Sequence, residues 1–198
     1  AADAVILAIG VAPENKLAKE AGLEIGRTGG IKVNDVFQTS DPDIYAVGDA
    51  IELRNKITGC EGRLALAGPA QRQARAAVDH IMGISNGRES RSFIGSSCIR
   101  GFGQNAACTG LNERAARDAG IHCTSVYVLP ADKVGVLPGS SYMGFKLVFE
   151  IPTGRILGAQ AIGKGDVLQR VNTVAALITM GGTLDDLKEL ELCYAPVY

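Results

Sequence analysis

The stretch that decides the fold of the first half of the chain is residues 39–49, Thr-Ser-Asp-Pro-Asp-Ile-Tyr-Ala-Val-Gly-Asp. Its first five residues are polar or proline and predict a tight turn. The apolar residues 44–47 then predict a buried strand that ends at Gly48 and Asp49. Ligands of α/β sheets bind just outside the carboxyl ends of the strands, so a glycine and a carboxylate placed there indicate a binding site. The alternative is an ordinary turn after a strand.

The segments around this stretch predict a domain that is only partly present. The apolar run 4–9 predicts a strand buried on both faces, which ends at Gly10. The other predicted elements are a helix over 15–21, a strand over 31–33, a loop over 50–68 and a helix over 69–82. These elements are too few to cover a parallel sheet on both faces. Residues 1–88 therefore predict an α/β remnant, an incomplete domain with a parallel sheet.

A different pattern follows the polar, glycine-containing stretch 83–92, which predicts a domain boundary. Strands are predicted over 93–100, 104–109, 123–129, 145–151 and 155–162. Helices are predicted over 112–120, from the capping residue Asp166 to Gly181, and after Thr183. Pro152-Thr153-Gly154 separates the last two strands and is typical of a hairpin. Residues 89–198 therefore predict an α+β domain with an antiparallel sheet.

Composition excludes several classes of protein. Of the 198 residues, 46% are hydrophobic and 21% charged, and the formal net charge is −1. The absence of a basic block argues against a nucleic-acid partner, and no apolar run approaches the roughly 20 residues of a membrane span. Five cysteines form no C-x-x-C pair and have no histidine spacing suited to zinc, so no metal site is predicted. We expect a reduced, cytoplasmic environment.

Residues 39–49 closely resemble the second flavin motif of FAD-dependent pyridine nucleotide-disulfide oxidoreductases, T-x-x-x-x-[IV]-[YF]-A-x-G-D. The resemblance implies that Asp49 binds the ribityl chain of FAD and that Gly48 permits its close approach. Upstream, residues 3–15 are similar to the A-x-G-x-x-P-N segment of the same family. That similarity implies that Gly10 lies near the nicotinamide nucleotide.

Residues 66–75 are similar to the family helix whose N-terminus points at the flavin ring. A helix N-terminus offers free N–H groups and partial positive charge, which suits the electron-rich pyrimidine edge of a reduced flavin. The resemblance implies that the backbone of Ala67 and Gly68 belongs to the FAD site. The alternative is an ordinary helix start.

Three stretches of the second half, 109–113, 154–163 and 189–198, are similar to the dimerisation domain of one branch of this family. The branch contains coenzyme A-disulfide reductases, NADH oxidases and NADH peroxidases. The resemblance implies a homodimer in which Tyr194 and Tyr198 reach the partner's active site and contribute to a thiol or disulfide pocket. A phenol suits that role as a hydrogen-bond donor near a thiolate. The alternative is that both tyrosines pack at an interface.

One feature departs from the coenzyme A-disulfide reductase pattern. Val136 and Leu137 precede Pro138-Gly139, where related reductases often carry aromatic residues. This departure weakens the prediction of coenzyme A disulfide as the substrate.

The family also needs two G-x-G-x-x-G fingerprints for its nucleotides, and neither is among these 198 residues. The chain is therefore similar to the carboxyl-terminal part of such an enzyme, without its N-terminal FAD and NAD half. The resemblance implies a parent that passes electrons from NAD(P)H through FAD to a small-molecule disulfide, a persulfide, a peroxide or oxygen. We expect the fragment itself to be inactive and dimer-forming. The alternatives are an NADH oxidase or peroxidase, and a free-standing dimerisation module without cofactor.

Overall fold

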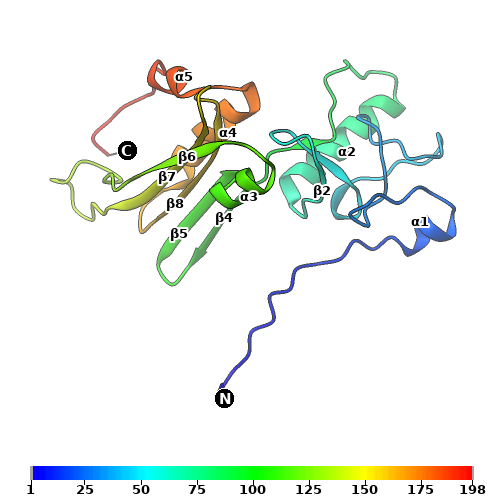
Figure 1. The fold of residues 1–198 in the computed structure, drawn as a ribbon, viewed down its shortest axis with the longest axis horizontal. Coiled ribbons are helices and arrows are strands. Elements are labelled where there is room, and N and C mark those ends of the chain that lie inside the picture. Colours follow the sequence, from blue (N-terminus) through cyan, green and yellow to red (C-terminus); the bar gives the residue numbers. More distant parts are fainter. Residues whose placement is uncertain (1, 198) are drawn as a thin grey trace. The chain divides into compact units, whose positions relative to one another are not determined.

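The computed structural model describes residues 2–197, which form two compact units (Figure 1). The first unit comprises residues 2–55 and 60–93, and the second comprises residues 56–59 and 94–197. The short segment 56–59 belongs to the second unit because Ile57 packs against its core. Each unit has a hydrophobic core of its own.

The first unit combines short helices with a small mixed sheet. Its elements are α1 (Lys16–Glu20), the 3-10 helix η1 (Gly48–Ala50), β1 (Leu53–Asn55), β2 (Glu61–Gly62), α2 (Ala67–Ile81) and β3 (Ser92–Phe93). Strand β1 pairs with β2 in antiparallel and with β3 in parallel. Phe37, Ile51 and Leu53 are each 1% exposed and pack in one core with Ala77 of α2. The predicted helices over 15–21 and 69–82 are confirmed as α1 and α2.

The second unit is a five-stranded antiparallel sheet with helices packed against it. Its elements are β4 (Ser96–Gly101), β5 (Gln104–Gly110), α3 (Glu113–Asp118), β6 (Cys123–Val128), β7 (Met143–Glu150), β8 (Ile156–Gly163), α4 (Leu168–Met180) and α5 (Leu184–Lys188). The strand order is β4-β5-β8-β7-β6, and every neighbouring pair is antiparallel. The predicted antiparallel α+β fold is confirmed, as is the predicted hairpin of β7 and β8.

The two faces of this sheet are covered unequally. Helix α4 packs Val171, Val174 and Ile178 against one face, beside the buried Ala107 and Ala161 of the sheet. Helix α3 covers only part of the opposite face, through the buried Ala116, which packs with Val148 and Leu157. Side chains alternate between the two faces along each strand, so the residues next to Ala107 and Ala161 lie on the face that α4 does not cover.

Local capping signals set the ends of the short helices. The side chain of Asn112 accepts a hydrogen bond from the Ala115 amide (2.8 Å) at the start of α3. Thr183 and Asp186 form a reciprocal capping box at the start of α5. The predicted box is confirmed. Such caps satisfy amides that the first helical turn leaves unpaired.

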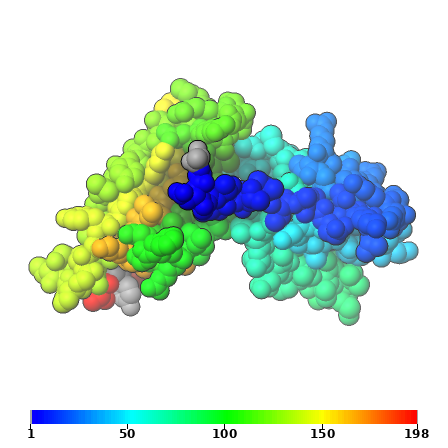
Figure 2. All heavy atoms as spheres, turned by 90° about the horizontal axis from the view of Figure 1, so that it is seen from below, coloured from blue at the N-terminus to red at the C-terminus, as the bar shows by residue number. Residues whose placement is uncertain are grey.

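The prediction of a buried strand over residues 4–9 is wrong. This segment is not a strand, and Val5, Ile6 and Ile9 are 79%, 91% and 90% exposed. Figure 2 shows the segment in dark blue at the molecular surface. A buried strand needs partner strands for its backbone groups, and no described residue pairs with this one. An apolar run alone thus predicted the wrong environment.

Two further predictions in the first unit are wrong. Residues 44–47 form no strand, only a single bridge between Gln38 and Tyr45, and Ile44 is 37% exposed. The segment 50–68, predicted as a loop, contains β1 and β2 and the deeply buried Ile51 and Leu53. The buried core residues of this unit therefore lie before and after the motif in sequence rather than within it.

Two predicted boundaries in the second unit also differ. The strand predicted over 93–100 is divided into β3 and β4, because Gly95 between them adopts a left-handed φ of 76°. The N-cap of α4 is Val167 rather than Asp166. Asp166 still caps the helix, because its carboxylate accepts a hydrogen bond from the Leu168 amide at 2.9 Å.

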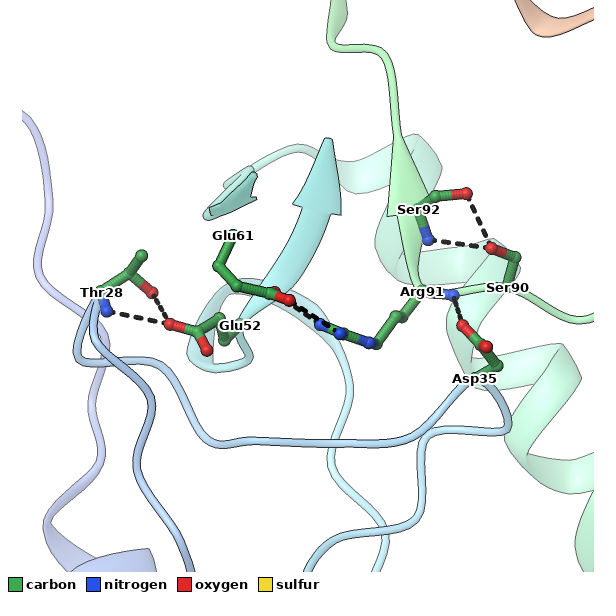
Figure 3. Close-up of polar contacts among 7 residues, drawn as sticks. All are labelled: Thr28, Asp35, Glu52, Glu61, Ser90, Arg91 and Ser92. Carbon is green, nitrogen blue, oxygen red and sulfur yellow. Dashed lines mark hydrogen bonds and ion pairs between the residues drawn. The ribbon is translucent and has the colours of Figure 1, made fainter. Parts of the chain in front are cut away.

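A polar cluster ties the end of the first unit to its small sheet (Figure 3). Arg91 donates two hydrogen bonds to the Glu61 carboxylate, at 2.6 and 2.8 Å, and its backbone amide donates to Asp35 at 3.1 Å. Beside this cluster, the buried Glu52 accepts hydrogen bonds from the amide and the hydroxyl of Thr28, at 2.9 and 2.8 Å. The hydrogen bonds from Arg91 hold the pKa of Glu61 below its ordinary value of 4.5.

We expect the Glu61–Arg91 pair to make the stability of the first unit depend on acid. Because the pKa of Glu61 is lowered on folding, its contribution is complete above pH 4.5 and is lost as the pH falls through the lower pKa of the folded state. Glu61→Gln should therefore reduce the loss of unfolding free energy on acidification, measured by urea unfolding at neutral and acidic pH. Glu20→Gln is the control, because the Glu20–Lys16 pair spans 4.0 Å in solvent. An unchanged acid dependence in Glu61→Gln would contradict the prediction.

Candidate functional site

The turn at Gly48 and Asp49 rests on helix α2. Gly48 has a φ of 79°, a conformation that glycine adopts without strain. Its amide donates a hydrogen bond to the side-chain oxygen Oε1 of Gln73, at 2.7 Å. A Cβ atom added at Gly48 would meet only the Cβ of Ala70, at 3.8 Å. The turn is thus held against the helix by a specific hydrogen bond.

Gln73 is a completely buried polar residue of α2. Its oxygen is used by Gly48, whereas its nitrogen Nε2 has no hydrogen-bond partner among the described residues. Buried side-chain donors in folded proteins are almost always paired. Gln73 Nε2 is thus a buried donor that residues 2–197 leave unpaired.

The first turn of α2 supplies free backbone amides close to this turn. Ala67 and Gly68 are exposed, and Leu66 at the N-cap makes no capping hydrogen bond with its side chain. No acidic residue lies in the first turn, so nothing within the helix neutralises its positive end. Ala67 lies about one turn ahead of Ala70, the residue that the Gly48 turn contacts.

Asp49 adds a negative charge to the same region. Its side chain is exposed and accepts no hydrogen bond from any residue between 2 and 197. Four of the predicted site residues thus lie on two elements that are in contact, Gly48 and Asp49 on η1 and Ala67 and Gly68 at the start of α2. The arrangement offers a hydrogen-bond acceptor on one side and amide donors with partial positive charge on the other.

Two contacts that sequence reasoning missed fasten the motif to α2. Besides the Gln73 bond, the hydroxyl of Tyr45 lies 2.6 Å from Nδ1 of His80. Gln73 and His80 are seven residues apart, so they share one face of the helix, on which Ala77 is also buried. No sequence signal distinguishes Gln73 and His80 from other polar residues of a helix.

The remaining predicted site residues lie elsewhere. Gly10 belongs to the exposed segment before α1, and a Cβ atom added there would meet nothing within 4 Å. Tyr194 lies in the second unit and is 77% exposed, without a hydrogen bond to the described chain. Its segment is tied down by the Val134 amide, which donates to the Pro196 carbonyl at 3.1 Å. Tyr198 lies outside the described residues.

Residues 109–113 connect helix α3 to the sheet of the second unit. Asn112 caps α3, and the Glu113 carboxylate forms an ion pair with Lys146 and accepts a hydrogen bond from the Ser125 hydroxyl at 2.7 Å. These partners, Lys146 first, lower the pKa of Glu113. The stretch thus joins α3 to strands β6 and β7.

None of the five cysteines forms a disulfide bond within residues 2–197. Within residues 2–197, no three histidine, cysteine or acidic side chains gather as a metal site would require. None of the described helices has both the length and the apolar character needed to cross a bilayer.

Comparison with known proteins bears on this geometry. Residues 1–74 match the pyridine nucleotide-disulphide oxidoreductase profile, and residues 102–198 match the profile of the dimerisation domain of the same enzymes. The chain belongs to the pyridine nucleotide-disulphide oxidoreductase family. The second match agrees with the antiparallel sheet and its helices, which form one compact unit.

Among relatives, the chain is 34% identical to the NAD(P)H sulfur oxidoreductase (CoA-dependent) of Pyrococcus furiosus, over 100% of the chain and 44% of that protein. It is 32% identical to an NADH oxidase of Methanocaldococcus jannaschii, over 98% of the chain and 42% of that protein. The solved structure of reduced CoADR-RHD of Bacillus anthracis is 42% identical, with a TM-score of 0.92 over 96% of the chain and 34% of that structure. The chain thus spans less than half the length of these relatives.

Proposed function

We propose that the chain is the carboxyl-terminal portion of a flavoprotein oxidoreductase that passes electrons from NAD(P)H through FAD to an acceptor. The observation that carries the proposal is the Gly48–Asp49 turn held on α2 beside the uncapped start of that helix. The family membership supports it. When bound, FAD supplies the chemistry of accepting a hydride and releasing electrons.

The residues of the turn fit such a cofactor. The exposed carboxylate of Asp49 can accept hydrogen bonds from the hydroxyl groups of a ribityl chain. Gly48 exposes backbone without a side chain, so a ligand can approach closely. The free amides of Ala67 and Gly68, at the positive end of α2, favour negative charge on the pyrimidine edge of a flavin. The unpaired Nε2 of Gln73 is the buried polar atom that a completed pocket would satisfy.

Sulfur compounds are the acceptors that we propose first, as a disulfide or persulfide. The Pyrococcus furiosus relative named as a sulfur oxidoreductase favours this class. The Methanocaldococcus jannaschii relative named as an NADH oxidase favours oxygen or peroxide as the second candidate. In the first candidate, the phenols of Tyr194 and Tyr198 donate hydrogen bonds to a thiolate of the partner subunit. The described chain leaves the Tyr194 side chain free for that role.

The test uses a protein that carries this chain together with the rest of the length found in its relatives. We expect the purified protein to show the visible absorption bands of bound flavin, and these bands to bleach when NAD(P)H is added without oxygen. Recovery of the bands on adding coenzyme A disulfide, a persulfide, peroxide or oxygen then identifies the acceptor. A colourless protein that takes up no FAD would overturn the proposal and favour a dimerisation module without cofactor.

We further propose that the second unit forms a homodimer through the sheet face that α4 leaves open. Paired residues of neighbouring strands share a face, and Ile99, Ala106 and Ile162 form one such row. Ile99 and Ile162 are 73% and 53% exposed, and Tyr127, which extends over Gly144 next to this row, is 62% exposed. Apolar surface gathered on one sheet face favours burial against a second copy, as the dimerisation-domain match suggests.

Ile162→Asp should convert the dimer to a monomer. A carboxylate at that position would be buried without a partner in the interface, which costs several kcal/mol of association free energy. Light scattering over a range of protein concentrations measures the change. Ile84→Asp is the control, because Ile84 is 68% exposed and lies in the first unit outside any element. A wild-type chain that remains monomeric at high concentration would contradict the proposed dimer.

A further inference from the structure

We propose that Gln73 is a positioning residue of the flavin site, which fixes the Gly48–Asp49 turn with one end of its amide and completes the pocket with the other. This inference rests on the proposed function. Gln73 is distinct from the residues that the flavin motif itself contains, since it follows Asp49 by 24 residues and lies in the second turn of α2. Its role is therefore to act through Gly48 and through the group that pairs with its nitrogen.

Gln73 restrains Gly48 through a hydrogen bond to its backbone amide. Glycine has more backbone conformational freedom than any other residue. Gly48, with a φ of 79°, therefore needs an external restraint to hold one backbone conformation. The amide of Gly48, a half-buried residue, donates a hydrogen bond to Oε1 of the completely buried Gln73 at 2.7 Å. This hydrogen bond orients the Val47–Gly48 peptide plane, and through it the start of the turn that carries Asp49.

The residue type at position 73 also carries information. Position 73 is 0% exposed and on the same helix face as Ala77, where an apolar side chain of equal volume would fill the space but would leave the Gly48 amide without its acceptor. Glutamine is instead present, with its nitrogen unpaired among the described residues. Leaving that donor unpaired in a finished protein would cost about 1–3 kcal/mol. The nitrogen therefore points to an acceptor that arrives when the pocket is complete.

Two variants separate this role from simple packing. Gln73→Met keeps the volume of the side chain and removes both polar ends. Gln71→Ala is the matched control, because Gln71 lies on the same helix but is exposed and makes no hydrogen bond within residues 2–197. In the longer protein that binds FAD, we expect Gln73→Met to weaken FAD affinity about tenfold, the effect of one buried hydrogen bond, and Gln71→Ala to leave it unchanged.

Two readouts other than affinity test the mechanism. In the 198-residue chain, amide hydrogen exchange at Gly48 should be faster in Gln73→Met than in wild type and unchanged in Gln71→Ala. In the longer protein labelled with 15N-glutamine, the side-chain resonance of Gln73 is identified as the one that is absent from the spectrum of Gln73→Met. In the wild-type apoprotein, this resonance should shift when FAD is added. Neither signal would respond if Gln73 served only to fill space.

The outcomes distinguish the two proposals. If the wild-type longer protein binds no FAD, the proposed function fails, and Gly48 exchange still decides whether Gln73 positions the turn. If wild type binds FAD and Gln73→Met binds it equally well, the inference about Gln73 is overturned while the proposed function stands. Reduced affinity together with unchanged Gly48 exchange and an unmoved Gln73 resonance would likewise overturn the positioning role.

Discussion

Gly158→Ala is expected to unfold the second unit, although it adds a single methyl group. A Cβ atom at position 158 would lie 2.0 Å from the carbonyl oxygen of Leu111 and 2.7 Å from its amide nitrogen. Both atoms belong to backbone that is itself held, because the Leu111 amide donates to the Leu157 carbonyl at 2.8 Å. Neither strand can move aside without breaking the pairing of β5 with β8.

The expected loss of unfolding free energy exceeds about 4 kcal/mol, because a clash with fixed backbone cannot be relieved by a side-chain rotation. Gly110, which pairs with Gly158, shows the same crowding: a Cβ atom there would lie 2.1 Å from the Leu157 carbonyl oxygen. Two facing glycines thus allow the strands to meet the chain entering α3. Urea unfolding followed by circular dichroism measures the effect in the 198-residue chain.

Gly101→Ala is the matched control for this prediction. Gly101 also lies in a strand of the sheet, at the end of β4, but a Cβ atom there would meet nothing within 4 Å. We expect a change within about 0.5 kcal/mol. Equal destabilisation by both substitutions would show that glycine is needed in these strands for a reason other than the contact with Leu111.

The second unit was largely predictable from sequence because its signals are local. The apolar residues of α4 recur at helical spacing, Thr183 and Asp186 form a capping box, and a turn separates β7 from β8. Each of these patterns is decided within about 15 residues of chain, and tertiary packing reinforced rather than replaced it. The boundary errors, at Gly95 and at Asp166, are of at most three residues.

The first unit was predicted less well because its environment depends on partners distant in sequence. The apolar run 4–9 carries the composition of a buried strand, but burial is a property of neighbours, and the described chain gives it none. Conversely, Ile51 and Leu53 lie in a stretch with mixed polar residues and are nevertheless 1% exposed. The hydrophobicity of the sequence alone therefore shows neither that residues 4–9 are exposed nor that Ile51 and Leu53 are buried.

The candidate site divides in the same way. The flavin-like motif identified Gly48 and Asp49, and the predicted helix start identified Ala67 and Gly68. Both signals could be recognised because each is carried by consecutive residues of the sequence. Gln73 was missed because a glutamine in the middle of a helix is ordinary in sequence and becomes informative only once it is buried and bonded to Gly48. Such a contact between segments 25 residues apart needs the fold to be known.

Asp49→Ala is expected to weaken FAD binding by the longer protein about a hundredfold and to leave the fold unchanged. The structure separates the two effects, because the Asp49 side chain is exposed and bonds to no described residue, so its removal costs the folded chain no contact. Hydrogen bonds to a charged acceptor contribute about 1.5–3 kcal/mol each, which is the source of the expected hundredfold change. Asp49→Asn keeps an acceptor oxygen without the charge and should lose less affinity than Asp49→Ala.

Asp43→Ala is the control that separates the loss of a specific hydrogen-bond acceptor from the loss of negative charge in the motif. Asp43 lies in the same motif and is equally an exposed carboxylate, but its position precedes the turn and its side chain makes no contact. FAD affinity, measured by quenching of flavin fluorescence on titration of apoprotein, should therefore be unchanged in Asp43→Ala. If Asp43→Ala and Asp49→Ala weaken binding equally, the effect is one of general charge. If neither does, the ribityl chain is bound elsewhere, and the likeness of residues 39–49 to a flavin motif is one of fold alone. A selective loss in Asp49→Ala, with an unchanged melting curve, would place the cofactor at the turn that Gln73 holds.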